Sequence, residues 1–159
     1  MTKVTPYNST ETKKKQVTKM FDNIAGSYDF LNHTLSLGMD NIWRKIAIKK
    51  LSNNTETILD IATGTGDFAI SAAKYTNANI TGIDISQGML DVGIKKIAKK
   101  GLTDRIKLQL ADSENLPFQD NSYDAITAGF GVRNFEDLNK GLSEMHRTLK
   151  SGGIVAILE

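Results

Sequence analysis

Residues 57–67 have the sequence TILDIATGTGD, a short apolar run followed by a glycine-rich turn. The run at residues 58–62 is typical of a buried β-strand, and the pattern at residues 67–75 is helical, so the turn joins a strand to a helix. Gly64 and Gly66 allow the backbone to turn sharply and to approach a ligand closely. Such turns are common, so a tight connection without a ligand is the plain alternative.

The chain after this turn continues to alternate between strands and helices. Further strands are expected at residues 79–84, 106–111, 123–129 and 154–158, and further helices at residues 86–100 and 135–150. This alternation predicts βαβ units and a doubly wound, mostly parallel α/β sheet, in which ligands bind at the carboxyl ends of the strands. The last strand ends with the chain, so we expect the final strands of the fold to be missing from it.

The first 52 residues stand outside the alternation. Helices are predicted at residues 13–25 and 40–51, with a loop or broken helix at 28–38 between them. In the second helix we expect Trp43 to pack on the sheet within an apolar stripe, with Arg44 on the opposite, polar side. We therefore expect a flexible leader, capping helices over the ligand edge, and an incomplete sheet domain, at residues 1–12, 13–52 and 53–159.

Composition excludes several classes of function. The chain has no cysteine, which excludes disulfides, thiolate metal sites and a cysteine nucleophile, and we assign no metal site. Its net charge of +2 is too balanced to indicate a nucleic-acid partner. It has neither an apolar stretch of membrane-spanning length nor a signal-peptide core, so we expect a soluble, cytoplasmic protein. The lysines at 13–15 are expected to be solvated, with contact at an anionic membrane surface as the alternative.

Three carboxylates follow successive predicted strands. Asp60 and Asp84 end the first two, and Asp112 follows the third. Asp84 lies about 20 residues after Gly64, where a carboxylate can accept both hydrogen bonds of a ribose diol. Asp112 or the amide of Ser113 could reach the edge of an adenine. Together these positions predict a ligand that contains adenosine.

The charge of Asp60 helps to choose between two such ligands. Gly64, Gly66 and Ala69 loosely match the dinucleotide fingerprint, so NAD is the main rival. A carboxylate at residue 60 would lie near the pyrophosphate and repel it, whereas it suits the ammonium group of S-adenosylmethionine, which lacks phosphates. We therefore favour S-adenosylmethionine. The expected cofactor contacts are Asp60, Gly64, Thr65, Gly66, Asp84, Asp112, Ser113 and Gly129.

Several longer segments carry a family resemblance. Residues 21–44 have the sequence FDNIAGSYDFLNHTLSLGMDNIWR, residues 112–124 are DSENLPFQDNSYD, and residues 130–134 are FGVRN. With the turn and the last residues of the chain, they resemble the UbiE/Coq5/MenG family of quinone C-methyltransferases. The turn is generic to methyltransferases, whereas residues 21–44 and 130–134 are more specific. Asp40 departs from the family, which usually has a histidine there, and Ser151 replaces a common proline.

The resemblance implies a Rossmann-like class I methyltransferase that transfers a methyl group from S-adenosylmethionine to the ring of a reduced polyprenyl quinone. The substrate would be demethylmenaquinol or a benzoquinol of the ubiquinone pathway. The ring carbon becomes nucleophilic when an adjacent phenol ionises, so a phenolate must be stabilised. Arg133 is the catalytic candidate, with a surface or interdomain ion pair as its alternative. Tyr28 and Asn32 are candidates for a lid over the substrate ring, and a place in this lid is the alternative for Trp43.

Other functions remain open at this point. The family extends well past residue 159, so an inactive fragment that only binds a nucleotide or a partner is one alternative. A methyltransferase of another small molecule is a second, and a nicotinamide dehydrogenase comes last. The lipid substrate gives peripheral membrane contact a purpose, and the resemblance leaves open a homodimer or an assembly with other quinone-pathway enzymes.

Overall fold

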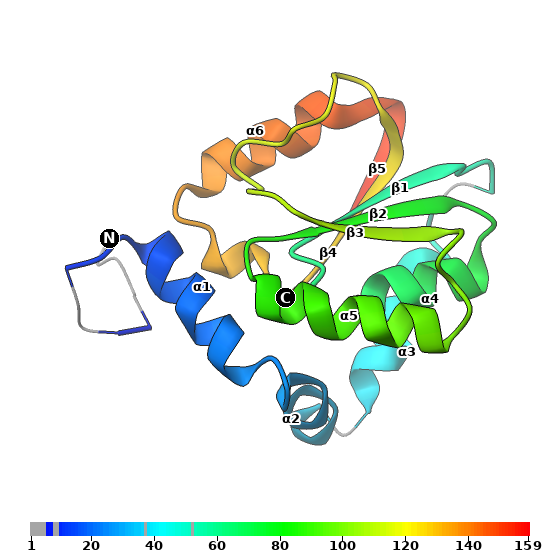
Figure 1. Ribbon diagram of the computed structural model, residues 1–159. Coiled ribbons are helices and arrows are strands. Elements are labelled where there is room, and N and C mark those ends of the chain that lie inside the picture. Colours follow the sequence, from blue (N-terminus) through cyan, green and yellow to red (C-terminus); the bar gives the residue numbers. More distant parts are fainter. Residues whose placement is uncertain (1–5, 8–9, 37, 52) are drawn as a thin grey trace.

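The computed structural model describes residues 6–7, 10–36, 38–51 and 53–159, and its centre is a five-stranded parallel sheet (Figure 1). The strands are β1 (Thr57–Ile61), β2 (Asn79–Asp84), β3 (Ile106–Leu110), β4 (Tyr123–Gly129) and β5 (Leu149–Leu158). The helices are α1 (Lys13–Ile24), α2 (Tyr28–Leu35), α3 (Met39–Ile48), α4 (Asp67–Tyr75), α5 (Gln87–Lys99), the 3-10 turn η1 (Val132–Asn134) and α6 (Leu138–Thr148). The strand order is β3-β2-β1-β4-β5, which confirms the predicted parallel α/β sheet.

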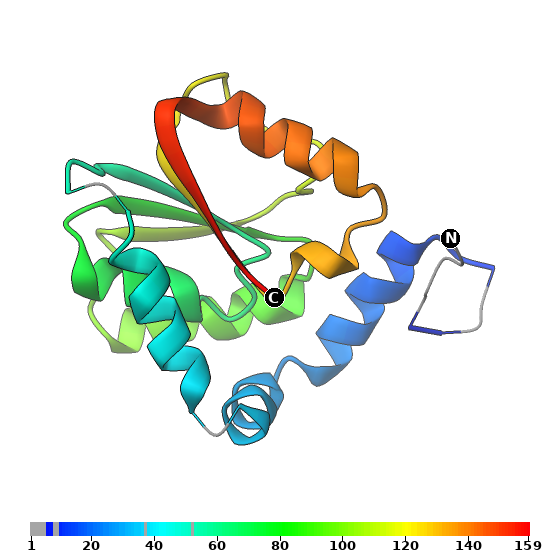
Figure 2. The same cartoon turned by 180° about the vertical axis from the view of Figure 1, so that it is seen from behind.

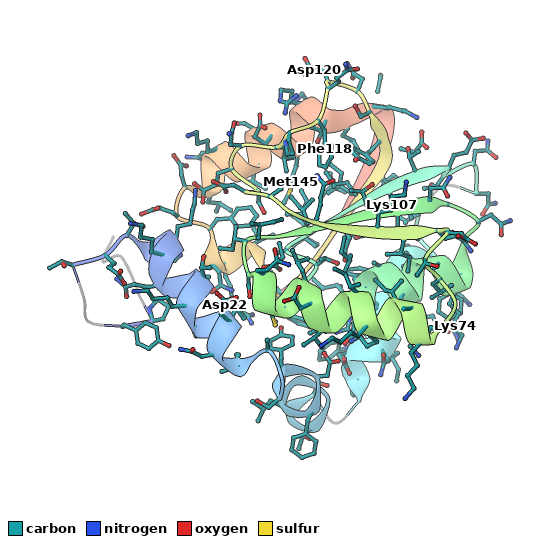
Figure 3. The ribbon with its side chains drawn as sticks, viewed as in Figure 1. Asp22, Lys74, Lys107, Phe118, Asp120 and Met145 are labelled. Atoms are coloured by element: carbon teal, nitrogen blue, oxygen red, sulfur yellow. The ribbon has the colours of Figure 1, made fainter. Side chains whose placement is uncertain are left out.

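Two apolar clusters bury the two faces of the sheet. On one face Ile58 and Ile80 pack under α3, α4 and α5. On the other, Leu59 packs with Met145 of α6, which points toward the sheet beside Phe118 (Figure 3). Seen from behind, α6 and α3 lie on opposite sides of the strands (Figure 2). Burial on both faces explains why the strands are continuous apolar runs.

The strand register brings the polar strand ends to one edge. Ile61 of β1 pairs with Ile83 of β2 and with Ala128 of β4. Asp84, at the end of β2, pairs with Leu110 of β3. The residues that follow these strands therefore meet at the carboxyl edge of the sheet, where a ligand site was expected.

Helix α1 lies along this carboxyl edge, beside the start of α5 (Figure 1). The Asp22 carboxylate accepts hydrogen bonds from the Ser86 hydroxyl at 2.5 Å and from the Gly88 amide at 3.0 Å. Thr12 caps the helix through the amide of Lys15. Of the leader expected at residues 1–12, residues 1–5 and 8–9 lie outside the described part of the chain.

The predicted orientation of α3 was wrong. Asp40 and Arg44 are buried, whereas Ile42, Trp43 and Ile46 are 54%, 40% and 53% exposed. Burial of the charges is possible because Arg44 Nη1 donates to Asp40 Oδ2 at 2.7 Å, so each charge has a partner. Trp43 consequently does not pack on the sheet, and its ring lies 6.4 Å from that of Phe130.

Three predicted element boundaries also need correction. Residues 28–35 form a helix, which selects the broken helix over the loop, and α6 spans residues 138–148 rather than 135–150. Strand β5 begins at Leu149 rather than at Ile154, with Gly152 and Gly153 inside it, where the register with β4 is irregular. Gly153 is needed there because a Cβ would come within 2.8 Å of the Asp124 carbonyl oxygen.

Candidate functional site

The glycine-rich turn after β1 is fixed by two aspartates. The amide of Gly64 donates to Asp84 Oδ2 at 2.8 Å, which ties the turn to the end of β2. The hydroxyls of Thr63 and Thr127 donate to the two oxygens of Asp60 at 2.5 and 2.6 Å. Gly64 has a φ of 57°, a left-handed conformation that favours glycine. The backbone of the turn is therefore positioned before any ligand arrives.

The other two predicted turn residues have different surroundings. Thr65 is 1% exposed, and its hydroxyl donates to Asp29 of α2 and accepts from Lys96 Nζ of α5 at 3.0 Å. Gly66 has a φ of 82° and precedes α4, and a Cβ there would meet Ile97. Thr65 thus links the turn to α2, whereas Gly66 shapes the turn without facing a cavity.

A cavity opens at the carboxyl edge of the sheet, with an empty volume of about 610 Å³. We call it the main cavity. Six of the residues predicted from the sequence line it, namely Tyr28, Gly64, Asp84, Asp112, Ser113 and Gly129. The topology therefore brings together the predicted strand-end groups, although they are far apart in the sequence.

A second, smaller cavity of about 350 Å³ adjoins the first. We call it the side cavity. It shares five lining residues with the main cavity, namely Tyr28, Ala62, Gly64, Gly129 and Phe130, and its other walls are Arg44, Asp60, Thr63, Thr65, Asp67 and Phe68. Asp60 borders the side cavity, but its side chain is wholly buried. It can therefore act on a ligand there through its charge and not through a solvent-exposed oxygen.

Burial alters the protonation of the acidic groups at this edge. It raises the pKa of Asp60 to about 6, although the hydroxyls of Thr127 and Thr63 and the charge of Arg44 oppose the rise. Burial also raises the pKa of Asp84, against the hydrogen bonds from the Ser86 and Gly64 amides. A cationic ligand group would relieve the cost of ionising these carboxylates.

Helix α1 contributes one wall of the main cavity. Its Lys14 Nζ lies 2.7 Å from Asp112 Oδ2 and 3.1 Å from Glu114 Oε2. The other oxygen of Asp112 accepts from the Glu114 amide at 2.9 Å. Both acids are therefore held by partners, and Asp112 faces the cavity as part of an ion pair.

Besides Gly66, two further predicted residues are not placed in the cavities. Arg133 lines neither; its guanidinium is 60% exposed, lies 3.3 Å from Glu159 and stands over the ring of Phe130. That arrangement matches the ion-pair alternative more closely than a direct contact with a ligand. Asn32 belongs to α2, but its side chain lies outside the described part of the structure.

Sequence reasoning missed most of the apolar walls. Phe21, Ile85, Met89 and Phe130 line the main cavity, although the sequence analysis assigned none of them to a site. Phe130 follows the predicted Gly129, and Ile85 follows Asp84, so adjacency to a strand end was a usable signal. Ala62 and Phe130 adopt left-handed φ values of 51° and 59°, for which the sequence gives no signal.

Several known proteins are similar to this chain in sequence. A model of the ubiE/COQ5 methyltransferase family matches residues 9–159. A demethylmenaquinone methyltransferase from Bacteroides fragilis is 53% identical over 99% of this chain and 65% of its own length. A ubiquinone/menaquinone biosynthesis C-methyltransferase UbiE from Geotalea daltonii is 48% identical over 92% of this chain and 64% of its own. The chain thus spans slightly under two thirds of these curated relatives.

Solved structures share the same fold. A structure described as a putative S-adenosyl-L-methionine-dependent methyltransferase from Methanococcus maripaludis has a TM-score of 0.74 and 30% identity, over 97% of this chain and 67% of its own. The [4+2]-cyclase SpnF has a TM-score of 0.78 at 23% identity, over 92% of this chain and 60% of its own, a likeness of fold alone. The second neighbour illustrates that this fold carries more than one chemistry.

Proposed function

Because the chain belongs to the ubiE/COQ5 methyltransferase family, we propose that it binds S-adenosylmethionine and methylates a ring carbon of a reduced polyprenyl quinone. Relatives named for demethylmenaquinone favour a naphthoquinol as the substrate, with a benzoquinol of the ubiquinone pathway as the second choice. The chain covers only part of these relatives, so this activity is proposed for the protein to which the chain belongs.

The observation that carries the proposal is the position of Asp84. Its carboxylate ends β2, is 7% exposed, lines the main cavity and accepts the Gly64 amide. A carboxylate has lone pairs beyond those used by the Gly64 and Ser86 amides, so it can also accept from a ribose diol. Asp60 adds negative charge beside the side cavity, which disfavours the pyrophosphate of NAD and suits a cationic cofactor.

The residues of the chain would orient the reaction. S-adenosylmethionine supplies an activated methyl group, because its sulfonium is already an electrophile. The apolar walls that include Phe21 and Phe130 would hold the quinol ring and exclude water. Tyr28 lines the main cavity with Phe21 and Phe130, so it would lie beside the ring. The polar groups at the strand ends, Asp84 and Asp112, would bind the adenosine part of the cofactor in the same cavity.

Calorimetry separates the cofactor classes. S-adenosylhomocysteine, the product of methyl transfer, should bind, and NADH should not. Asp84→Ala should weaken this binding by roughly 1–3 kcal/mol, since a hydrogen bond to a charged group is lost. The matched control is Asp104→Ala, a change at an exposed aspartate outside both cavities. Binding of NADH alone, or unchanged affinity in Asp84→Ala, would contradict this cofactor assignment.

A methyl-transfer assay separates the substrates. Incubation with labelled S-adenosylmethionine should label a demethylated naphthoquinol in preference to a benzoquinol. Labelling of neither quinol, with the cofactor still bound, would favour a methyltransferase of another small molecule or an inactive fragment.

We also propose Arg133 as a residue that stabilises the phenolate. It follows Phe130 and precedes Asn134, both of which line the main cavity, and its charge opposes the rise in the pKa of Tyr28. Arg133→Ala should lower turnover about 100-fold while leaving the affinity for S-adenosylhomocysteine within about twofold. Arg133→Lys, which keeps the charge, should retain more activity. If Arg133→Ala has the same turnover as the wild type, the role of Arg133 is the ion pair with Glu159 and not catalysis.

A lipid substrate would also bring the protein to a membrane surface, and we propose that α2 and α3 make this contact. Phe30, Ile42, Trp43 and Ile46 are 72%, 54%, 40% and 53% exposed, and we call them the apolar surface. Exposed lysines at residues 45, 49 and 50 accompany it, a combination that suits anionic lipid headgroups. No helix in the described ranges has the length and hydropathy needed to cross a bilayer.

Vesicle sedimentation tests the apolar surface. The chain should sediment with vesicles of anionic phospholipid, and the double variant Ile42→Ser/Ile46→Ser should not. Tyr75→Ser, an exposed residue on another helix, is the control. If the double variant changes only the oligomeric state measured by ultracentrifugation, the surface is an interface between copies instead.

A further inference from the structure

Two lysines of α1 contact the loops that border the main cavity. Lys13 and Lys14 lie in the first turn of this helix, where the helix dipole disfavours positive charge, and both are half-buried. Lys13 Nζ donates to the carbonyl oxygens of Phe135 and Arg133, at 2.7 and 3.1 Å. Both lysines were expected to be solvated, but each has its partners in the protein.

Glu114 lies at the centre of these contacts. Its side chain is 7% exposed, lines the main cavity and uses its two oxygens for different segments. Oε2 lies 3.1 Å from Lys14 Nζ of α1, and Oε1 accepts the amide of Glu136 at 2.8 Å. The amide of Glu114 donates to Asp112 Oδ1 at 2.9 Å. One buried carboxylate thus joins the loop after β3, the segment between η1 and α6, and helix α1.

Stability alone does not explain an ion pair at this place. The cost of desolvating two buried charges offsets their attraction, so an apolar residue of similar volume would serve the fold as well. The carboxylate instead fixes geometry, because each of its oxygens has a partner at a set distance. The segment that it fixes follows Arg133 and Asn134, and Asn134 lines the main cavity.

We propose that Glu114 is a positioning residue, which couples cofactor binding at Asp112 to the placement of residues 132–136. This inference rests on the proposed function, in which Asp112 binds the adenosine and Arg133 stabilises the phenolate. A cofactor that contacts Asp112 restrains the loop after β3, and Glu114 transmits this restraint to the Glu136 amide. The quinol side of the main cavity is therefore ordered once the cofactor is bound. Because coupling is reciprocal, a bound quinol also raises the affinity for the cofactor.

Amide hydrogen exchange, measured with and without S-adenosylhomocysteine, tests the coupling. In the wild type, the ligand should slow exchange about fivefold or more at residues 133–135 as well as in the turn after β1. These three amides are suitable reporters, because their acceptors are Glu159, Gly131 and Val132. A change in their exchange is therefore not the direct loss of a contact with Glu114.

Three variants separate coupling from packing. Glu114→Met keeps the bulk of the side chain but removes the acceptor of the Glu136 amide. Lys14 stays paired with Asp112 in this variant. Glu114→Gln keeps an oxygen that can accept the Glu136 amide. The matched control is Glu144→Ala, because Glu144 accepts an amide of the loop after β3 at 2.7 Å but lines neither cavity.

In Glu114→Met the ligand should still slow exchange in the turn after β1, but its effect at residues 133–135 should fall below about twofold. Glu114→Gln and Glu144→Ala should keep the wild-type effect in both places. An undiminished effect at residues 133–135 in Glu114→Met, or its loss in both places, would overturn the coupling. If the ligand binds the wild type without slowing residues 133–135, the coupling is wrong while the proposed cofactor stands. If the ligand does not bind at all, the proposed cofactor is wrong as well, and the coupling falls with it.

Discussion

Asp60 shows how a single buried carboxylate can serve a site without touching solvent. Both of its oxygens accept threonine hydroxyls, which orient the turn after β1 and the middle of β4. Its sequence position at a strand end was enough to predict that it lies at the carboxyl edge of the sheet. The fully buried state could not be predicted, nor could the threonine partners from the turn after β1 and from β4, because they depend on the strand register.

The raised pKa of Asp60 makes stability depend on pH. The folded chain holds this proton up to about pH 6, whereas the unfolded chain releases it near pH 4. The folded state therefore binds more protons over this window, and this group makes stability fall as pH rises through it. Relative to the wild type, Asp60→Asn should gain about 2–3 kcal/mol of unfolding free energy between pH 4 and pH 7.

Urea unfolding of both proteins at several pH values measures this difference. Asp104→Asn, at an exposed site, serves as the control. A stability difference between the wild type and Asp60→Asn that stays constant from pH 4 to pH 7 would mean that Asp60 ionises normally in the fold.

Helix α3 shows where a hydrophobic pattern misleads. Residues 42, 43 and 46 form a true apolar stripe, but the face that packs on the sheet carries Asp40, Arg44, Ala47 and Ile48. Periodicity identifies the helix and its two faces. It cannot tell which face is buried when two charged residues on one face neutralise each other, as Asp40 and Arg44 do. By contrast, the strand bounds at residues 79–84 and 123–129 match the prediction, because a strand covered on both faces is a bare apolar run.

Two isoleucines of α3 provide a matched test of this orientation. Ile48 is 2% exposed and belongs to the core cluster, whereas Ile46 is 53% exposed. Ile48→Ala should cost roughly 2–4 kcal/mol of unfolding free energy, because it leaves a cavity. Ile46→Ala should cost less than about 1 kcal/mol. Denaturant titration gives both values, and a reversed order would mean that the apolar stripe faces the sheet after all.

The opposite edge of the sheet depends on another strand-borne acid, Asp124 of β4. Its Oδ2 accepts from the amides of Glu56 and Thr57, and its Oδ1 lies 2.8 Å from Lys150 Nζ. Burial would raise its pKa, but the hydrogen bonds from Lys150 and Thr57 outweigh it and lower the pKa to about 2. This one carboxylate thus ties together the starts of β1, β4 and β5.

Removing Asp124 should destabilise the fold without changing ligand binding. Asp124→Ala should cost roughly 1–3 kcal/mol at neutral pH. Because the pKa of Asp124 is lowered in the folded state, the variant should show its full loss of stability above about pH 4. This loss should become smaller as pH falls toward 2. Chemical unfolding measures the cost, and calorimetry with S-adenosylhomocysteine should show unchanged affinity. Weakened binding of that ligand would show instead that the two edges of the sheet are coupled.

At the scale of the whole molecule, helices α1 and α2, which we call the cover, are held in place by different contacts from those of the sheet. Among the side chains described in residues 12–36, Val17 and Ala25 are the buried apolar ones, whereas the sheet buries two extended clusters. The cover is held mainly by polar contacts, which include Lys14–Asp112, Asp22–Ser86 and Asp29–Lys96. Segments with few buried apolar contacts open at lower free energy than core strands. The cover could not be predicted from periodicity, because its partners lie far away in the sequence.

Amide hydrogen exchange should therefore separate the cover from the sheet. Amides of α1 and α2 should exchange with an opening free energy at least about 2 kcal/mol below that of β1 and β4. S-adenosylhomocysteine should slow exchange in α1 and α2, because Tyr28 and Phe21 would close on the bound ligand. Lys96→Met removes the ion pairs with Asp29 and Asp67, so it should speed exchange in α2 but not in β4. Protection of α1 and α2 equal to that of β1 would mean that they unfold with the sheet, and a ligand would then have to enter beneath a closed cover.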